Sequence, residues 1–337
     1  MNARFCSVCA PGLEEPVARR LKRDTGCRTE LVDSGFMVYG LNVRKPAIKI
    51  ACLPYLNNSF AVLRVWRGVS LERAAEKIAG LDGLGCLIEA RNKSFRLIAS
   101  DGNKFANMED GARRAAETRI ARLAGMRVDR AKPDTEFWIY RRDKIDVYFL
   151  QRITNDARGD APVRKGELRP ALAAAICVAA GSDKFETVCD PFAGYGAIPR
   201  ALMNWENPKS ILCFDNDPEC VKHMESTLRH ESRRLIVKRA DSLGLSLAEK
   251  PDAVITDPPW GKYGDEPGGG CASESFCLRM LDMLAVNLSS GGALALLVSA
   301  DGAALHLLEK DGRFAGKKTY AMLVSGKKAL LYTGRRE

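Results

Sequence analysis

The chain has 337 residues, 46% of them hydrophobic, which is enough to fill the cores of about two ordinary domains and excludes a disordered protein. Its 11 cysteines are scattered, with only Cys6 and Cys9 in a C-x-x-C pair, which excludes a disulfide-rich secreted scaffold and argues against a zinc site. No secretory signal and no stretch long enough to span a bilayer is visible. We therefore expect a cytoplasmic protein with neither a metal nor a membrane partner. Its oligomeric state stays open, with a monomer as the simplest expectation.

The formal net charge of +10 is concentrated in the first half of the chain. Residues 1–165 hold 31 Lys and Arg against 20 Asp and Glu, a net of +11, whereas residues 166–337 hold 21 against 22, a net of −1. Such an asymmetry indicates that one half faces a polyanion, although charge that only keeps a domain soluble explains it as well.

The first half mixes strands and helices without a regular alternation. The pattern predicts a helix over residues 107–124 and then a β-hairpin. The two hairpin strands, 136–141 and 144–151, alternate apolar and polar residues on either side of Arg142 and Asp143.

Residues 155–166 contain two Gly, one Pro and several charges in place of any apolar periodicity, which predicts a linker. The expected organisation is therefore an N-terminal α+β domain over residues 1–154, the linker over 155–166, and a second domain over 167–337.

Strands and helices alternate regularly after the linker. Helices are predicted at 167–180, at 197–205, from about Asp217, at 276–290 and after Asp301. Strands are predicted at 187–190, 211–215, 235–240, 252–256, 292–299, 319–325 and 328–333. This alternation predicts an α/β fold with a doubly wound, parallel, Rossmann-like sheet, which binds ligands beyond the carboxyl ends of its strands.

The first chemical signal, D-P-F-A-G-Y-G over residues 190–196, follows a predicted strand directly. Gly194 and Gly196 let the backbone turn tightly and approach a ligand that a β-carbon would exclude. The third glycine of a dinucleotide fingerprint is replaced by Pro199, which counts against NAD and FAD.

Two further signals follow the next two strands. Asp215 ends one strand and is placed to accept hydrogen bonds from ribose hydroxyls, whereas Asp217 precedes Pro218 and is expected to cap a helix. Asp241 follows the strand 235–240, where its carboxylate and the N–H of Ser242 are placed to read the edge of an adenine ring; a plain turn residue is the alternative.

The most specific signal is D-P-P-W-G over residues 257–261. Consecutive prolines remove two backbone donors, so the Asp257 carboxylate and the Pro258 carbonyl form an acceptor-only pair suited to an amino group. Trp260 offers a flat face on which a nucleobase can stack. We expect the catalytic residues to be Asp257, Pro258, Pro259 and Trp260.

Residues 187–261 resemble the class I S-adenosylmethionine-dependent methyltransferases that methylate amino groups and carry a [DNS]-P-P-[YFW] motif. The resemblance implies S-adenosyl-L-methionine as cofactor. It also implies the cofactor-binding set Asp190, Phe192, Ala193, Gly194, Gly196, Asp215, Asn216, Asp241, Ser242 and Asp257. Tyr195 and Ala197 stand where the family often has Ser and Thr, which puts the affinity for the cofactor in question.

The first half adds a second resemblance. Residues 50–152, with KSFRL at 93–97 and the predicted helix and hairpin, look like a THUMP domain, and residues 9–21 are similar to the segment that precedes it. THUMP implies RNA, usually tRNA. The combination resembles the guanine-N2 methyltransferases of tRNA and large-subunit rRNA, with base flipping and an Asp257-assisted attack as the implied mechanism.

Three alternatives stay open. They are a large-subunit rRNA guanine-N2 methyltransferase, an adenine-N6 methyltransferase of DNA or RNA, and an RNA-binding protein without activity. The individual Arg and Lys residues of the first half cannot be ranked as RNA contacts. Tyr263 and the glycine-rich stretch 264–270 are read as a substrate loop or as a plain surface turn.

Overall fold

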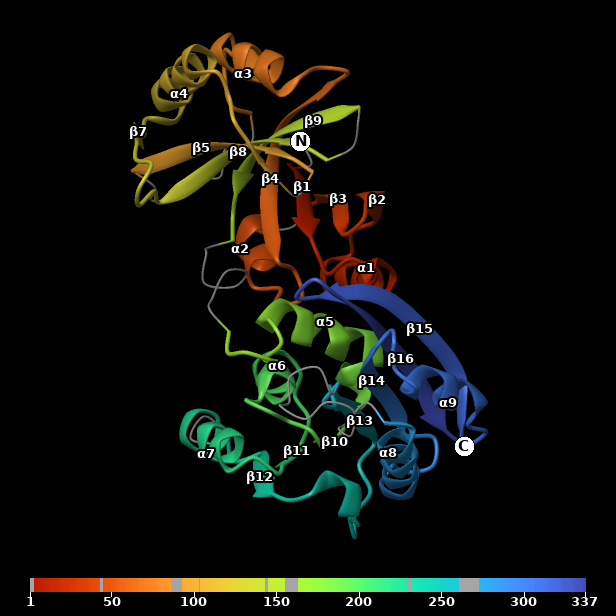
Figure 1. The fold of residues 1–337 in the computed structure, drawn as a ribbon. Helices are drawn as coiled ribbons and strands as arrows, with labels where there is room; N and C mark the ends of the chain where they lie inside the picture. Colours follow the sequence, from red (N-terminus) through yellow and green to blue (C-terminus); the bar gives the residue numbers. More distant parts are fainter. Residues whose placement is uncertain are drawn as a thin grey trace. The chain divides into compact units, whose positions relative to one another are not determined.

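The computed structural model describes residues 3–42, 45–85, 93–102, 104–142, 145–154, 163–229, 232–260 and 273–337. Gly261, Tyr263 and the stretch 264–270 lie outside the described residues. The chain divides into two compact units (Figure 1), one formed by Met1–Cys9 with Ala18–Asp160 and one formed by Ala10–Val17 with Ala161–Glu337.

The second unit is built on a seven-stranded sheet with the order β12-β11-β10-β13-β14-β16-β15. The strands in that order are β12 (Leu235–Arg239), β11 (Ser210–Asp215), β10 (Thr187–Asp190), β13 (Ala253–Thr256), β14 (Ala293–Ser299), β16 (Lys327–Arg336) and β15 (Phe314–Val324). The first five are parallel and the last two antiparallel. Every residue of β13 and β14 is buried, as expected for central strands covered on both faces.

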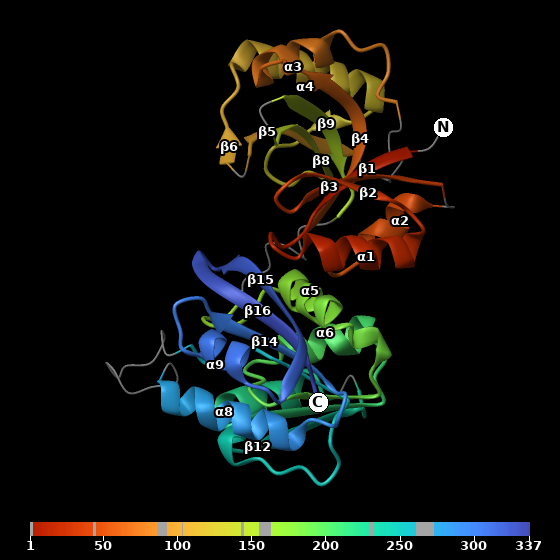
Figure 2. The same ribbon diagram turned by 90° about the vertical axis from the view of Figure 1, so that its right-hand side faces the viewer.

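Helices flank this sheet (Figure 2). They are α5 (Pro170–Ala180), α6 (Ala197–Trp205), α7 (Pro218–Thr227), α8 (Glu274–Asn287) and α9 (Ala304–Lys310). Two short 3-10 turns, η1 (Ser182–Lys184) and η2 (Ser242–Gly244), complete the unit. The predicted Rossmann-like architecture is confirmed for this unit.

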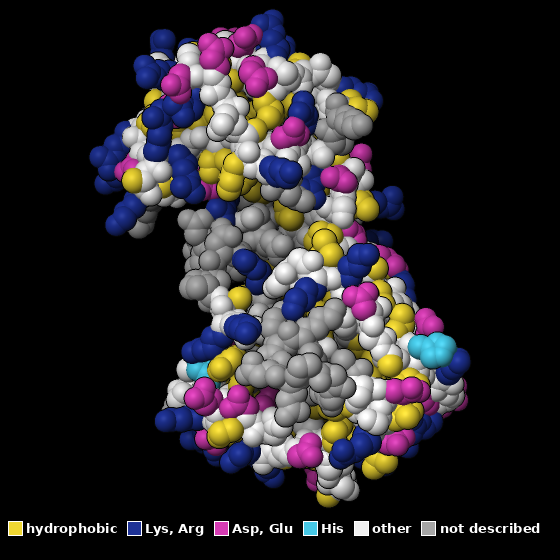
Figure 3. Space-filling model, viewed as in Figure 1, with side chains coloured by type: hydrophobic (Ala, Val, Ile, Leu, Met, Phe, Trp, Pro, Cys, Tyr) yellow, Lys and Arg dark blue, Asp and Glu magenta, His cyan; other side chains and the backbone are white. Residues whose placement is uncertain are grey.

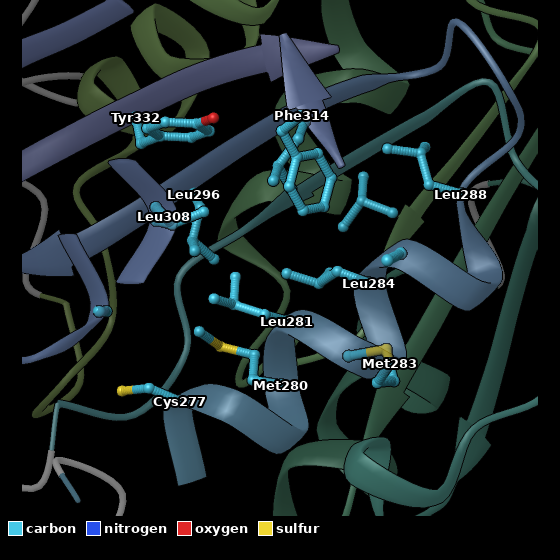
Figure 4. Packing of buried hydrophobic residues seen from close by; sticks show 14 of the residues in the cluster. Cys277, Met280, Leu281, Met283, Leu284, Leu288, Leu296, Leu308, Phe314 and Tyr332 are labelled. Atoms are coloured by element: carbon cyan, nitrogen blue, oxygen red, sulfur yellow. The ribbon is translucent and has the colours of Figure 1, made fainter. Parts of the chain in front are cut away.

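The main core lies between the sheet and helices α8 and α9 (Figure 4). Met280, Leu281 and Leu284 of α8 pack there with alternate residues of β14, including Leu296. Burial of apolar surface stabilises the folded state by about 25 cal/mol per Å². This packing keeps β14 and its neighbouring strands, and therefore their ends, in fixed positions.

The first unit is built on a nine-stranded mixed sheet with the order β2-β3-β1-β4-β9-β8-β5-β6, and β7 pairs with β5. Its strands are β1 (Ala3–Val8), β2 (Thr29–Asp33), β3 (Phe36–Leu41), β4 (Asn58–Arg67), β5 (Ser94–Asp101), β6 (Lys104–Ala106), β7 (Arg127–Val128), β8 (Thr135–Arg141) and β9 (Asp146–Arg152). Its helices are α1 (Glu14–Thr25), whose first residues group with the second unit, α2 (Pro46–Ala51), α3 (Leu71–Ala79) and α4 (Asp110–Ala124).

The two faces of this sheet are covered differently. Helices α3 and α4 pack on one face through a core that includes Phe95, Phe137 and Phe149. The other face carries a second cluster rich in aromatic residues, among them Phe36, Phe60, Tyr140 and Tyr148.

Most predicted elements are confirmed, with boundary shifts that have local causes. The hairpin 136–141 and 144–151 is the antiparallel pair β8 and β9. Helix α4 begins at Asp110 rather than 107, because the backbone of Glu109 is not helical. Helix α5 begins at Pro170 rather than 167, because proline suits the first helical turn. In the described part of the chain, no helix combines the length and apolar character that crossing a membrane requires.

Candidate active site

Four aspartates lie at the carboxyl ends of neighbouring parallel strands. Asp190 ends β10, Asp215 ends β11, Asp241 follows β12 and Asp257 follows β13. Since these strands are adjacent in the sheet, the four predicted residues share one edge, where open α/β sheets bind their ligands.

The glycine loop after β10 needs its two glycines for different reasons. Gly196 has a φ of +83°, and a β-carbon there would come within 2.6 Å of Leu228 Cδ1. Gly194 also has a positive φ, +54°, but a β-carbon there would meet nothing within 4 Å. Gly196 therefore serves packing, whereas Gly194 leaves open space beside the loop.

Asp215 fastens this loop to the neighbouring strand. Its Oδ2 accepts a hydrogen bond from the Gly194 N–H at 2.7 Å, and its Oδ1 accepts one from the Asp217 N–H at 2.9 Å. Asp217 in turn accepts from the Glu219 N–H at 2.8 Å, which confirms its predicted role as the cap of α7.

Asp241 and Ser242 belong to the turn η2. Asp241 accepts from the Leu243 N–H at 3.1 Å, which is the turn role named as its alternative, and the Ser242 hydroxyl donates to the Pro191 carbonyl. Neither residue, nor Asp215 or the exposed Asn216, lines the two cavities described below. Their contacts with ribose and adenine stay predictions.

Asp190 is the most deeply buried acid of the edge, with an exposed fraction of 1%. Its Oδ1 accepts from the Thr256 hydroxyl at 2.6 Å and from the Phe192 N–H at 3.2 Å. Burial raises the pKa of Asp190 to about 7, because no cation among the described residues compensates its charge.

Asp257 is held by the aromatic residue of its own motif. The Trp260 indole N–H donates to Asp257 Oδ1 at 2.9 Å. Burial raises the pKa of Asp257, the indole hydrogen bond lowers it and the neighbouring charge of Asp190 raises it, with a net value of about 8. Asp257 is therefore a carboxyl group poised to ionise near neutral pH.

Two adjoining cavities meet at Asp257. A cavity of about 200 Å³ is lined by Asp190, Phe192, Ala193, Gly194, Tyr195 and Ala197 among others. A second cavity of about 400 Å³ is lined by Pro258, Pro259, Trp260, Val324 and Ser325 among others. Asp257 and the segment Lys165–Leu168 line both cavities. A group held in one cavity can therefore be brought against a group held in the other.

Residues 163–166 were missed as part of the wall of the site. Residues 163–166 belong to the predicted linker, yet they line the larger cavity. The turn at Ser325 was also missed; Ser325 and Gly326 both have positive φ, as a two-residue hairpin turn between β15 and β16 requires. Only the position of residues 163–166 directly before a predicted helix hinted at their role.

A stack of three side chains holds the segment that both cavities share. The Arg164 guanidinium lies 4.8 Å from the centre of the Tyr195 ring, and Arg164 Nη1 lies 3.2 Å from His223 Nε2. The rings of Tyr195 and His223 meet edge to face at 5.6 Å. Burial and the Arg164 charge lower the pKa of His223, which keeps the imidazole neutral and able to accept from Arg164.

The described residues do not form a metal site. Within those ranges, no group of three or more His, Cys, Asp or Glu side chains could hold a metal ion.

Residues 158–330 match the RMKL-like methyltransferase domain family, UPF0020. The chain belongs to this family. A tRNA (guanine(10)-N2)-dimethyltransferase of Methanothermobacter thermautotrophicus is 30% identical over 217 residues, which are 59% of this chain and 60% of that protein. The chain thus spans about 60% of that relative's length.

Two solved structures share the fold over the whole chain. TrmN from Thermus thermophilus aligns with a TM-score of 0.75 and 19% identity, covering 99% of this chain and 100% of that one. SMU.472, solved in complex with SAH, aligns with a TM-score of 0.69 and 14% identity, covering 100% of this chain and 99% of that one. As a member of this methyltransferase family, the chain uses S-adenosyl-L-methionine as its methyl donor.

We expect Tyr195→Ser to weaken cofactor binding about threefold to fivefold. The substitution removes the ring under Arg164, and a cation–π contact at an exposed site is worth about 0.5–1 kcal/mol. Tyr195→Phe keeps the ring and should bind within about twofold of the wild type. Calorimetric titration with S-adenosylhomocysteine measures both; equal affinities for the Ser and Phe variants would show that the stack does not hold the cavity wall.

We expect the stability of Asp257→Asn relative to the wild type to rise between pH 5 and pH 8, so that its advantage is at least about 1–2 kcal/mol larger at pH 8 than at pH 5. The raised pKa means that the folded state binds more protons than the unfolded state between those values, so the wild type loses stability as pH rises. Urea unfolding at the two pH values measures this. Asp311→Asn is the control of opposite sign, because Arg313 lowers the pKa of Asp311; a gain in both variants would contradict the assignment.

Proposed function

We propose that the chain transfers the methyl group of S-adenosyl-L-methionine to the exocyclic N2 of a guanosine in structured RNA, with tRNA rather than rRNA as the substrate. The observation that carries this proposal is the position of Asp257 and Pro258. Asp257 lines both cavities, and Pro258 contributes a carbonyl without a backbone donor beside it.

The smaller cavity fits the cofactor. Gly194 leaves open space beside the loop, and the carboxyl groups of Asp190 and Asp257 face a ligand that carries an ammonium and a sulfonium charge. When bound, the sulfonium supplies an electrophilic methyl group. In this proposal the cofactor is held by Asp190, Phe192, Ala193, Gly194, Gly196, Asp215, Asn216, Asp241, Ser242 and Asp257.

The larger cavity fits a planar base with an amino group. Asp257 and the Pro258 carbonyl accept the two N–H bonds of that amino group, which turns the nitrogen lone pair toward the methyl group. The carboxylate stabilises the positive charge that develops on the nitrogen, and the proton then leaves to Asp257 or to water. Trp260, held by its hydrogen bond to Asp257, supplies the stacking face, and Pro259 fixes the backbone between them.

Guanine and RNA are favoured by the relatives and by the charge. The dimethyltransferase that is 30% identical to this chain acts, by its name, on guanine N2 of tRNA. The net charge of +11 on residues 1–165 suits a polyanion, in agreement with the THUMP-like reading of that half, which stays a proposal.

We expect Asp257→Asn to lower methyl transfer at least 100-fold, because the carboxylate charge that stabilises the transition state is lost. Asp217→Asn, which changes only a helix cap, is the matched control and should stay active. The assay supplies separated tRNA and rRNA from a strain lacking the gene and identifies the product by nucleoside mass spectrometry. N2-methylguanosine in tRNA supports the proposal; N6-methyladenosine, or full activity in Asp257→Asn, contradicts it.

We expect kcat/KM for RNA to rise about tenfold per pH unit below pH 7 and to level off above pH 8. The carboxyl pair titrates in this range, and Asp257 must be ionised to accept the amino group. Asp257→Asn should lose this rise, since the group is gone. A wild-type profile that is flat between pH 6 and 8 would exclude Asp257 as the ionising acceptor.

A further inference from the structure

The edge strand β6 of the first unit carries Phe105, the most exposed large hydrophobic side chain of the described residues, at 79%. Its ring lies 6.0 Å from the ring of Trp138, at an angle of 40°. Neither ring is used by the proposed active site. Trp138 is half-buried, whereas the Phe105 ring beside it is open to water, and exposed apolar surface of this kind marks a place where a ligand can bind.

Trp138 is fixed in its orientation before any ligand arrives. Its indole N–H donates to Glu136 Oε2 at 2.9 Å, and the rings of Phe60 and Tyr140 meet it edge to face at 5.7 Å and 6.1 Å. A ring held in this way loses little conformational entropy when a planar ligand stacks on it.

Glu136 is itself held by two arginines. Arg152 Nη1 donates to Glu136 Oε2 at 2.9 Å, and Arg96 Nε donates to Glu136 Oε1 at 2.8 Å. The three charges sum to +1. The Arg96 side chain is 34% exposed, so its guanidinium can present further N–H donors to a ligand on this face.

The strand register places these groups on one face of the sheet. Arg96 of β5 pairs with Glu136 of β8, Ile98 pairs with Trp138, and Ser100 pairs with both Tyr140 and Phe105. Residues of the opposite parity, such as Phe95 and Phe137, lie under α3 and α4. Arg96, Trp138 and Phe105 therefore share the face that those helices leave uncovered.

The charge of the strands and turns around this face is net positive. Outside α4, which covers the opposite face, residues 93–109 and 125–142 hold 8 Lys and Arg against 5 Asp and Glu, a net of +3. Figure 3 shows Lys and Arg side chains over the part of the first unit where β5 and β7 lie in Figure 1. A ligand of this surface needs a flat apolar body and negative charge.

We propose that Phe105 and Trp138 form a stacking platform for an unpaired nucleotide of the RNA substrate, with Arg96 contacting its phosphate. The inference rests on the proposed function, since the RNA that is methylated is the ligand. A base stacks on the exposed Phe105 ring beside the half-buried Trp138, and the backbone follows the basic residues around them. A duplex would not suffice, because its bases are already stacked on one another.

The test measures binding of unmodified tRNA and of a single-stranded oligoadenylate of about 12 nucleotides to the full chain. Phe105→Ala should weaken both about tenfold, within the range that stacking of one base provides. Phe105→Leu, which keeps apolar bulk without an aromatic face, should lose as much. Phe105→Tyr should bind like the wild type.

Salt and cofactor give the controls. The ratio of wild-type to Phe105→Ala affinity should be equal at about 50 and about 200 mM salt, because stacking is not screened whereas phosphate contacts are. Leu31→Ala changes another exposed apolar residue of the same sheet, 56% exposed, and should bind RNA normally. Affinity for S-adenosylhomocysteine should be unchanged in every variant.

The outcomes separate this inference from the proposed function. If the wild type methylates tRNA and Phe105→Ala has the same KM and the same RNA affinity as the wild type, the platform is overturned and the proposed function is not. If Phe105→Leu binds RNA as tightly as the wild type, the contact is apolar and does not depend on aromatic stacking, which overturns the stacking platform. If Phe105→Ala loses self-association but keeps its RNA affinity, the surface binds a second copy of the chain and the platform is overturned. If the wild type methylates no RNA, the proposed function is overturned. If the wild type also fails to bind oligoadenylate, the platform is overturned as well.

Discussion

The second unit depends on the burial, at one edge of a parallel sheet, of two carboxyl groups that no cation among the described residues compensates. Asp190 ends β10 and Asp257 follows the fully buried strand β13, and burial lifts their pKa values to about 7 and 8. Free energy is therefore stored in the folded protein at neutral pH, because the ionised forms are poorly solvated. In the proposed function, a sulfonium ligand relieves this cost on binding. The same burial that weakens the fold would then favour binding of a cation at this edge.

The two cavities also share part of their walls. The segment Lys165–Leu168 and the side chain of Asp257 are common to both cavities, so groups bound in the two cavities would lie next to each other. The stack of Arg164 with Tyr195 and His223 connects that wall to the glycine loop and to α7. Tyr195, at the position where the methyltransferases that this chain resembles often have serine, provides the ring over which the guanidinium lies.

The strand-end aspartates and the alternation of elements could be predicted from the sequence, because the carboxyl ends of parallel strands must share an edge. Asp217 as a cap followed from the proline after it. The wall at 163–166 could not be predicted, since a short charged segment carries no periodicity and only tertiary packing gives it a role. The stack of Arg164, Tyr195 and His223 joins residues up to 59 positions apart, and the sequence holds no local sign of such a contact.

Two tryptophans show how one hydrogen bond can serve opposite purposes. Trp138 donates its indole N–H to Glu136, and Trp260 donates its own to Asp257. At Glu136, burial works against ionisation, but Arg152 and the surrounding hydrogen bonds outweigh it and lower the pKa, so the carboxylate is a fixed support for the ring. At Asp257, the described residues supply no such arginine, and the pKa is raised. The Glu136 carboxylate therefore serves to orient the ring of Trp138. The Asp257 carboxylate can still accept a proton or interact with a positive charge. In the two proposals, the pair Trp138–Glu136, whose carboxylate is neutralised by arginines, suits a surface that only binds a nucleobase. The pair Trp260–Asp257, whose carboxylate has no such partner among the described residues, suits a site where a nucleobase reacts.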